Sequence, residues 1–153
     1  MSLVGFIRIK AYYFIVALHR YIFIYIYGME VGRNVKISRR AILDLSINPK
    51  GIHIGNNVII SGNVIVLSHD HLRGIKEDTF IGDNVFVGNG SMILPGIHIG
   101  NHVAIGAGSV VTKDIPSHCI AAGNPAQIIY SGTIISDDCQ LINKGNRISN
   151  INN

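Results

Sequence analysis

The strongest constraint on the fold is a six-residue repeat in the middle of the chain. From residue 52 the sequence reads IHIGNN, VIISGN, VIVLSH, and from residue 79 it reads TFIGDN, VFVGNG, SMILPG, IHIGNH, VAIGAG, SVVTKD. A period of six fits neither a helix nor an alternating strand, but it fits short strands joined by tight corners. The third position of every hexad is aliphatic: Ile54, Ile60, Val66, Ile81, Val87, Ile93, Ile99, Ile105 and Val111.

This pattern predicts an all-β solenoid, a parallel β-helix of hexapeptide repeats, over residues 29–130. One branched aliphatic side chain per hexad points inward, and Gly, Asn or Asp follows where the backbone turns, often at positive φ. Stacked coils then pair their strands in parallel and bury a ladder of Val and Ile on each face. A less regular stretch places Val31, Ile37 and Leu43 in the same six-residue phase, which extends the solenoid toward the N-terminus.

The regular repeat is interrupted after the hexad VIVLSH. The spacing from Val66 to Ile81 is two hexads and half of a third, so the phase of the repeat is lost between them. We therefore expect a loop at about residues 70–78 to leave the solenoid at this corner. Insertions in repeat proteins commonly carry the binding face.

Residues 1–28 form an apolar N-terminal segment, for which we expect one or two helices, with a strand as the alternative. Two functions stay open: a membrane-interface anchor, with aromatic and basic residues at the headgroups, or a cap for the solenoid. His19 and Arg20 interrupt the apolar run, and no small-residue cleavage site follows, which argues against a signal peptide and a transmembrane span. Five tyrosines lie here: Tyr12, Tyr13, Tyr21, Tyr25 and Tyr27.

At the other end, residues 131–153 lose the repeat and are rich in Asn, Ser and Asp. They predict a polar tail with little core of its own.

Composition narrows the class of partner. The net charge of +4 is a mild bias that suits a polyanionic cofactor or a membrane surface. It does not indicate nucleic acid, because no Arg/Lys run is interleaved with aromatic residues. Cys119 and Cys139 are not spaced as a metal or redox motif, which favours a reducing, cytoplasmic location. If residues 1–28 are an anchor, that location is the inner face of the membrane.

One stretch has a more specific signature than the repeat alone. From Ile81 the sequence reads IGDNVFVGNGSMILPGIHIGNHVAIGAGSVVTKDIP, followed by AAGNPA. This resembles the hexapeptide-repeat acyltransferases, and within them the small sugar and antibiotic O-acetyltransferases, over about residues 51–129. The resemblance implies left-handed coils with three hexads per turn and a homotrimer with active sites between subunits. It also implies acetyl-CoA as acyl donor, a carbohydrate acceptor and no metal.

Transfer of an acetyl group to a hydroxyl needs a base and donors for the tetrahedral oxyanion. His69 ends VIVLSH where the loop begins, and it matches the catalytic His of the resembled family. His71 is the alternative base, because a shift of two residues exchanges them. Asp70 could orient the imidazole, as could a backbone carbonyl or, from a preceding coil, Asp44. For the oxyanion, the resemblance points to the backbone N–H of Asn89 in the VFVGNG corner.

The resemblance also assigns a groove for CoA. Its small residues let the pantetheine arm lie close to the backbone, and Lys113 meets the CoA phosphates. Gln127 stands where the family carries Arg or Lys, which weakens the phosphate contact unless cations of a neighbouring subunit compensate. Phe86 replaces a Trp of several members and keeps an aromatic wall for the acceptor. The residues implied to bind the cofactor are Gly88, Gly106, Ala107, Lys113, Asn124, Pro125 and Gln127, and the candidate compensating cations are Arg33, Lys36, Arg39 and Arg40.

The sequence therefore favours an acetyl-CoA-dependent O-acetyltransferase that acts on a sugar hydroxyl in surface polysaccharide or lipopolysaccharide biosynthesis. One alternative is a zinc protein like the γ-class carbonic anhydrases, which share this solenoid, with His53, His98 and His102 as ligands. The spacing of four between His98 and His102 does not suit a repeat of six. The other alternative is a non-catalytic scaffold, against which the SHDH string and the CoA-end motif argue.

Overall fold

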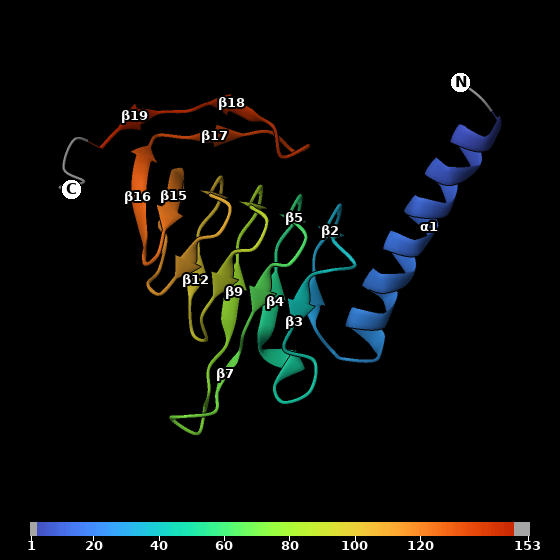
Figure 1. The fold of residues 1–153 in the computed structure, drawn as a ribbon, viewed down its shortest axis with the longest axis horizontal. Helices are drawn as coiled ribbons and strands as arrows, with labels where there is room; N and C mark the ends of the chain where they lie inside the picture. Colours follow the sequence, from blue (N-terminus) through green and yellow to red (C-terminus); the bar gives the residue numbers. More distant parts are fainter. Residues whose placement is uncertain (1–2, 149–153) are drawn as a thin grey trace.

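The computed structural model describes residues 3–148, excluding the side chains of residues 3, 4, 9, 12, 13 and 16. The roles expected of the Tyr12 and Tyr13 side chains thus lie outside the described residues. One helix, α1 (Leu3–Tyr25), precedes a stack of short strands in which the chain coils from one end to the other (Figure 1).

Three sheets form the faces of the coil, and the chain visits them in turn. Sheet 1 contains β1 (Glu30–Val31), β4 (Ile52–Ile54), β9 (Thr79–Ile81) and β12 (His98–Ile99), all parallel. Sheet 2 contains the parallel strands β2 (Lys36–Ile37), β5 (Ile59–Ile60), β10 (Phe86–Val87), β13 (Ala104–Ile105) and β15 (Cys119–Gly123), extended by antiparallel β16 (Ala126–Ser131) and β19 (Asn146–Arg147). Sheet 3 contains β3 (Ile42–Leu43), β6 (Ile65–Val66), β11 (Met92–Ile93) and β14 (Val110–Val111), again parallel.

The core is a set of stacked aliphatic ladders. Every predicted third position is buried, from Val31 at 8% exposed to Val111 at 0%. The first position of each hexad is buried as well, so each hexad places two side chains inside, and the prediction of one was wrong. The reason is the period of two within a strand, which turns positions one and three inward and position two outward. The buried first positions are Ile52, Val58, Val64, Thr79, Val85, Ser91, Ile97, Val103 and Ser109.

The corners turn at the sixth position of the hexads, as the sequence predicted. Asn57, Asn63 and Asn84 adopt positive φ between 55° and 58°, and Gly90, Gly96, His102 and Gly108 adopt positive φ at the equivalent position of later hexads. Asn tolerates this left-handed conformation better than most residues. Its side chain also links the coils, because Asn57 Nδ2 donates to Asn84 Oδ1 at 2.9 Å.

The register of the parallel strands reveals two insertions. Where the repeat is unbroken, His98 pairs with Phe80, which lies three hexads earlier in the chain. Ile81 pairs with Ile54 and Ile60 pairs with Ile37, and both of these spacings exceed three hexads. The additional chain lies at one corner, between sheets 3 and 1.

Each insertion has a structure of its own. The first holds a short 3₁₀ helix (Pro49–Gly51), and the second is a hairpin of β7 (His69–Asp70) and β8 (Ile75–Lys76). The sequence predicted the second insertion only, because the first lies in its less regular part.

The last turns of α1 pack on the first coil. Arg20 donates from Nε to the carbonyl of Gly32 at 2.9 Å and from a terminal guanidinium nitrogen to the carbonyl of Val31 at 3.1 Å. Phe23, Ile24 and Tyr27 lie against the buried core. In the described chain, no helix is long and apolar enough to cross a membrane. The C-terminal end of α1 is therefore fixed against the first coil.

The C-terminal segment differs from the expected polar tail. After β16 it runs back along the coils as β17 (Ile134–Ile135) and β18 (Leu141–Asn143) (Figure 1). Ile135 is 2% exposed, and Asp137 Oδ1 accepts from the side-chain amides of Asn57 and Asn84 at 3.1 Å each. This segment therefore covers the Asn corner, a tertiary contact that no sequence periodicity signals.

We expect the Ile135→Ala variant to lose about 2 kcal/mol or more of unfolding free energy, because it leaves a cavity under the C-terminal segment. The neighbouring Ile134 is 42% exposed. Ile134→Ala is the matched control and should stay within about 0.5 kcal/mol of wild type. Chemical denaturation measures both variants, and equal losses would mean that this segment does not pack as described.

Candidate active site

A buried carboxylate meets an imidazole at the corner between sheets 3 and 1. Asp44 follows β3 and His69 follows β6 one coil later, where Leu43 pairs with Val66. The Nδ1 atom of His69 is hydrogen-bonded to Oδ2 of Asp44. The side chain of Asp44 is only 2% exposed and that of His69 is 19% exposed. The imidazole therefore lies between a buried anion and the solvent.

The hydrogen bonds define the charge and the tautomer of this pair. Burial alone would raise the pKa of Asp44, but hydrogen bonds from His69 and Ser68 outweigh it, and the pKa is lowered. Asp44 is thus a carboxylate at neutral pH and accepts the Nδ1–H of His69. The Nε2 atom of His69 has no hydrogen-bond partner in residues 3–148.

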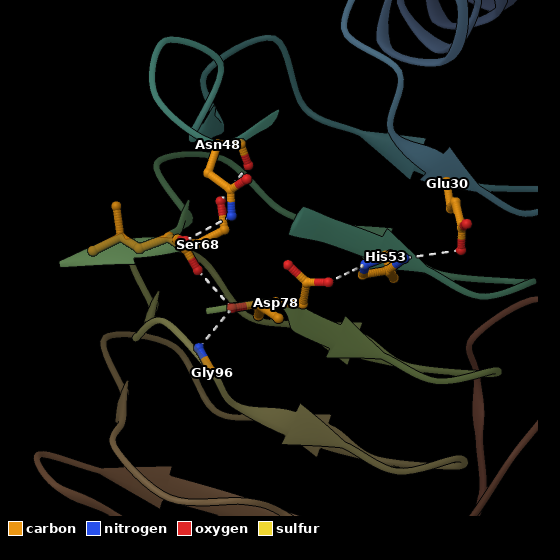
Figure 2. Close-up of polar contacts among 8 residues, drawn as sticks. Glu30, Asn48, His53, Ser68, Asp78 and Gly96 are labelled. Atoms are coloured by element: carbon orange, nitrogen blue, oxygen red, sulfur yellow. Dashed lines mark hydrogen bonds and ion pairs between the residues drawn. The ribbon is translucent and has the colours of Figure 1, made fainter. Parts of the chain in front are cut away.

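Neighbouring loops hold the pair in place. The backbone N–H of Ser68 donates to Asp44 Oδ2 at 3.2 Å, and its hydroxyl donates to the carbonyl of Asn48 at 2.6 Å. The amide of Asn48 donates back to the carbonyl of Ser68 at 2.9 Å (Figure 2). In the next coil, the Thr79 hydroxyl donates to the carbonyl of Leu67 at 2.6 Å. The sequence assigned no role to Ser68 or Asn48, because their contact depends on the unpredicted first insertion.

The hairpin residues next to His69 have other partners. Asp70 accepts from Nε of Arg73 at 2.6 Å and from its backbone N–H at 3.0 Å, and these bonds lower the pKa of Asp70. The prediction that Asp70 could orient the imidazole was therefore wrong, because Arg73 binds this carboxylate and Asp44 takes that role. His71 lies exposed in the turn of the hairpin.

Asn89, the expected oxyanion donor, lies at a different corner. It follows β10 and precedes β11, so it stands between sheets 2 and 3. Its carbonyl accepts from Gly108 N–H at 2.8 Å, but its own N–H has no acceptor among residues 3–148. This free donor and His69 lie at opposite edges of sheet 3. One chain alone therefore does not bring them together.

The residues expected to bind the cofactor are likewise divided between the corner of Asn89 and the corner of His69. Gly88 and Gly106 lie beside Asn89, at positions where stacking leaves no room for a side chain. A Cβ on Gly88 would lie 2.6 Å from the backbone nitrogen of Ala107, and one on Gly106 would lie 2.7 Å from the Cβ of Ala122. Lys113 follows β14 and lies exposed at the corner between sheets 3 and 1, the corner of His69.

The β15–β16 hairpin carries the remaining predicted cofactor residues. Asn124 and Pro125 form its turn, joined by a cis peptide bond, and Gln127 is the second residue of the return strand. All three are exposed. The Gly123 N–H donates to the hydroxyl of Ser109 at 3.2 Å, which holds the turn against the coil next to Gly106.

The three histidines considered as zinc ligands do not meet. His53 and His98 lie on opposite sides of the Phe80 ring. His53 stacks on it with a centroid distance of 4.3 Å, and His98 is tilted against it at 4.6 Å. His53 also contacts Glu30 at 2.8 Å and Asp78 at 3.3 Å (Figure 2). His102 stacks on His118 at another corner. Over the described residues, no group of three or more His, Cys, Asp or Glu side chains could hold a metal ion.

Known proteins share the hexapeptide repeat of this chain. The family model for bacterial transferase hexapeptide (six repeats) matches residues 78–113, and that for the hexapeptide repeat of succinyl-transferase matches residues 40–68. A crystal structure of a maltose O-acetyltransferase from Clostridium difficile 630 is 33% identical with a TM-score of 0.55, over 65% of this chain and 67% of that one. The chain belongs to the hexapeptide-repeat acetyltransferase family.

Two galactoside acetyltransferases are also similar to this chain. The galactoside O-acetyltransferase of Escherichia coli (strain K12) is 36% identical over 110 residues, 64% of this chain and 54% of that protein. A galactoside acetyltransferase solved in complex with coenzyme A is 35% identical with a TM-score of 0.51, over 67% of this chain and 54% of that one. The chain spans 43–60% of the length of the first curated relatives it matches.

The lowered pKa of Asp44 predicts how stability depends on pH. Its folded pKa lies below the unfolded value, so the ionised carboxylate stabilises the fold at neutral pH, and this contribution is lost as the pH falls through the folded pKa. Asp44→Asn should therefore be less stable than wild type at about pH 7, and the difference should shrink toward about pH 3. Urea unfolding at several pH values measures this, with the exposed Asp138→Asn as control. A difference independent of pH would contradict the assignment.

Proposed function

We propose that the chain is an acetyl-CoA-dependent O-acetyltransferase acting on a sugar hydroxyl. The observation that carries the proposal is the His69–Asp44 pair, in which a buried anion holds Nδ1 and leaves Nε2 free at the surface. This is the arrangement required of a general base. CoA complexes among the family's solved structures support acetyl-CoA as the acyl donor.

Each step of the proposed reaction uses a named atom. His69 Nε2 takes the proton of the acceptor hydroxyl while that oxygen attacks the thioester carbonyl. The carbonyl oxygen becomes an oxyanion and accepts the backbone N–H of Asn89. Collapse of the tetrahedral intermediate breaks the C–S bond, and the sulfur leaves with the proton from Nε2. Asp44 stabilises the imidazolium between the two proton transfers.

The proposal includes a homotrimer of left-handed coils with active sites between subunits. Its support is the separation of His69 and Asn89 at opposite edges of sheet 3. If the corner of one chain that carries His69 faces the corner of its neighbour that carries Asn89, the base and the oxyanion donor meet. The same arrangement brings Lys113 of one chain toward the groove beside Gly106 of another.

The acceptor we propose is a sugar of a surface glycan, such as a capsule or lipopolysaccharide intermediate, modified at the inner face of the membrane. Its support is the sugar acetyltransferases among the relatives and the exposed apolar face of α1. The proposal is tested by calorimetry with acetyl-CoA, followed by release of free thiol with a panel of sugars. Failure to bind acetyl-CoA would overturn it in favour of a scaffold.

Removing the base should separate chemistry from binding. We expect His69→Ala to lower turnover by roughly 10²–10⁴-fold while leaving acetyl-CoA binding nearly intact, because the imidazole acts on the acceptor proton. His71→Ala tests the alternative base and should keep most of the activity. The reverse result, with His71→Ala inactive and His69→Ala active, would move the role to His71.

Lys113 should contact a phosphate of CoA. We expect Lys113→Ala to weaken CoA more than dephospho-CoA, because only CoA carries the 3′-phosphate. Calorimetric titration of both ligands makes dephospho-CoA the internal control. Equal weakening of the two would place this lysine elsewhere.

A further inference from the structure

A groove of about 810 Å³ lies between α1 and sheet 2. Arg8, Ala11 and Ile15 of α1 form one wall. The segments 36–40 and 59–62 of the first two coils form the opposite wall, and Asn89 lies at its end. Sequence analysis did not identify this groove, because α1 and the coils are brought together only by the tertiary fold.

The charged residues that line the groove are all positively charged. Four cations line it and no Asp or Glu does: Arg8, Lys36, Arg39 and Arg40. In the part of the chain that the structure describes, none of the four forms an ion pair. Cations gathered in a concave site attract an anion, and paired guanidinium groups suit the geometry of phosphate.

The remaining residues that line the groove are mostly apolar. Helix α1 also carries exposed apolar residues. Ala11, Ile15, Ile37 and Ile59 line the groove beside the cations. On α1, exposed apolar residues recur at spacings of four, three and four, which makes one continuous stripe on a helix. The stripe consists of Phe14, Leu18, Tyr21 and Tyr25, each at least 47% exposed. A ligand that fits both features carries a phosphate and a lipid chain.

The groove also leads to the proposed acyl-transfer site. Gly62 lies between two polar side chains of neighbouring coils: a Cβ there would be 3.0 Å from Asn89 Oδ1 and 3.6 Å from Ser38 Oγ. Because Asn89 lines the groove, the groove includes the corner that presents the free N–H of this residue. A ligand with its phosphate among the cations can extend a sugar to that corner.

We propose that this groove binds the phosphate or diphosphate of a lipid-linked sugar, and that this amphiphile is the acetyl acceptor. The inference rests on the proposed function and names the class of its acceptor. The lipid lies along Ala11, Ile15 and the stripe of α1, and the phosphate lies between Arg8 and the Arg39–Arg40 pair. The sugar hydroxyl then reaches the Asn89 corner.

The test measures binding of farnesyl diphosphate to the full chain by calorimetry. Farnesol and inorganic pyrophosphate separate the contributions of lipid and phosphate, and both should bind more weakly than farnesyl diphosphate. The Arg39→Ala/Arg40→Ala double variant should weaken farnesyl diphosphate by roughly 10–100-fold, as expected for lost charge-assisted contacts. Lys10→Ala is the matched control, because Lys10 is an exposed cation of α1 beside Phe6 that does not line the groove. It should bind as wild type does.

Acetyl-CoA binding and oligomeric state are measured on the same double variant. Unchanged acetyl-CoA affinity, with farnesyl diphosphate binding lost, supports the inference. Lost acetyl-CoA affinity with farnesyl diphosphate binding retained would assign the groove to CoA and overturn it. A change of oligomeric state would make the groove a subunit contact and also overturn it. If wild type binds acetyl-CoA but not farnesyl diphosphate, the inference fails and the proposed function stands.

Discussion

The structure depends on the stacking of hexads that each bury two side chains. The residues at positions one and three, most of them aliphatic, fill the coil, and the backbone hydrogen bonds join each strand to the neighbouring coils. Because each contact is with a neighbouring coil, the stack needs its open end covered. Helix α1 covers the first coil through Phe23, Ile24 and the bonds of Arg20.

The regularity of the coil also affects where a functional site can form. Its faces are flat and its side chains repeat, whereas the His69–Asp44 pair lies where the repeat is broken. Both insertions leave the solenoid at the corner between sheets 3 and 1, one directly after Asp44 and the other directly at His69. The loops then contact each other through Asn48 and Ser68, which holds the carboxylate and the imidazole in one geometry.

The separation of functional groups along sheet 3 gives the proposed trimer a chemical reason. The proposed base and Lys113 occupy one edge, whereas the free N–H of Asn89 and the closely stacked Gly88 and Gly106 occupy the other. Assembly under the proposed function would complete the site, and the cationic groove beside α1 opens at the Asn89 edge. In this view the helix that caps the solenoid also forms part of the acceptor site.

The sequence by itself determined the coil. The third-position aliphatics, the Asn and Gly corners and the insertion after Val66 all follow from spacing, because a period of six constrains each residue locally. The break in the repeat and the family resemblance also led to the proposal of His69 as the base, and the structure places it beside Asp44. Only the tertiary structure decided that Asp44 rather than Asp70 holds the imidazole, that residues 131–148 cover the Asn corner, and that α1 closes a cationic groove. These contacts join residues that lie far apart in the chain, such as Asp44 with His69 and Asn34 with Asp137, and no local pattern encodes such distances.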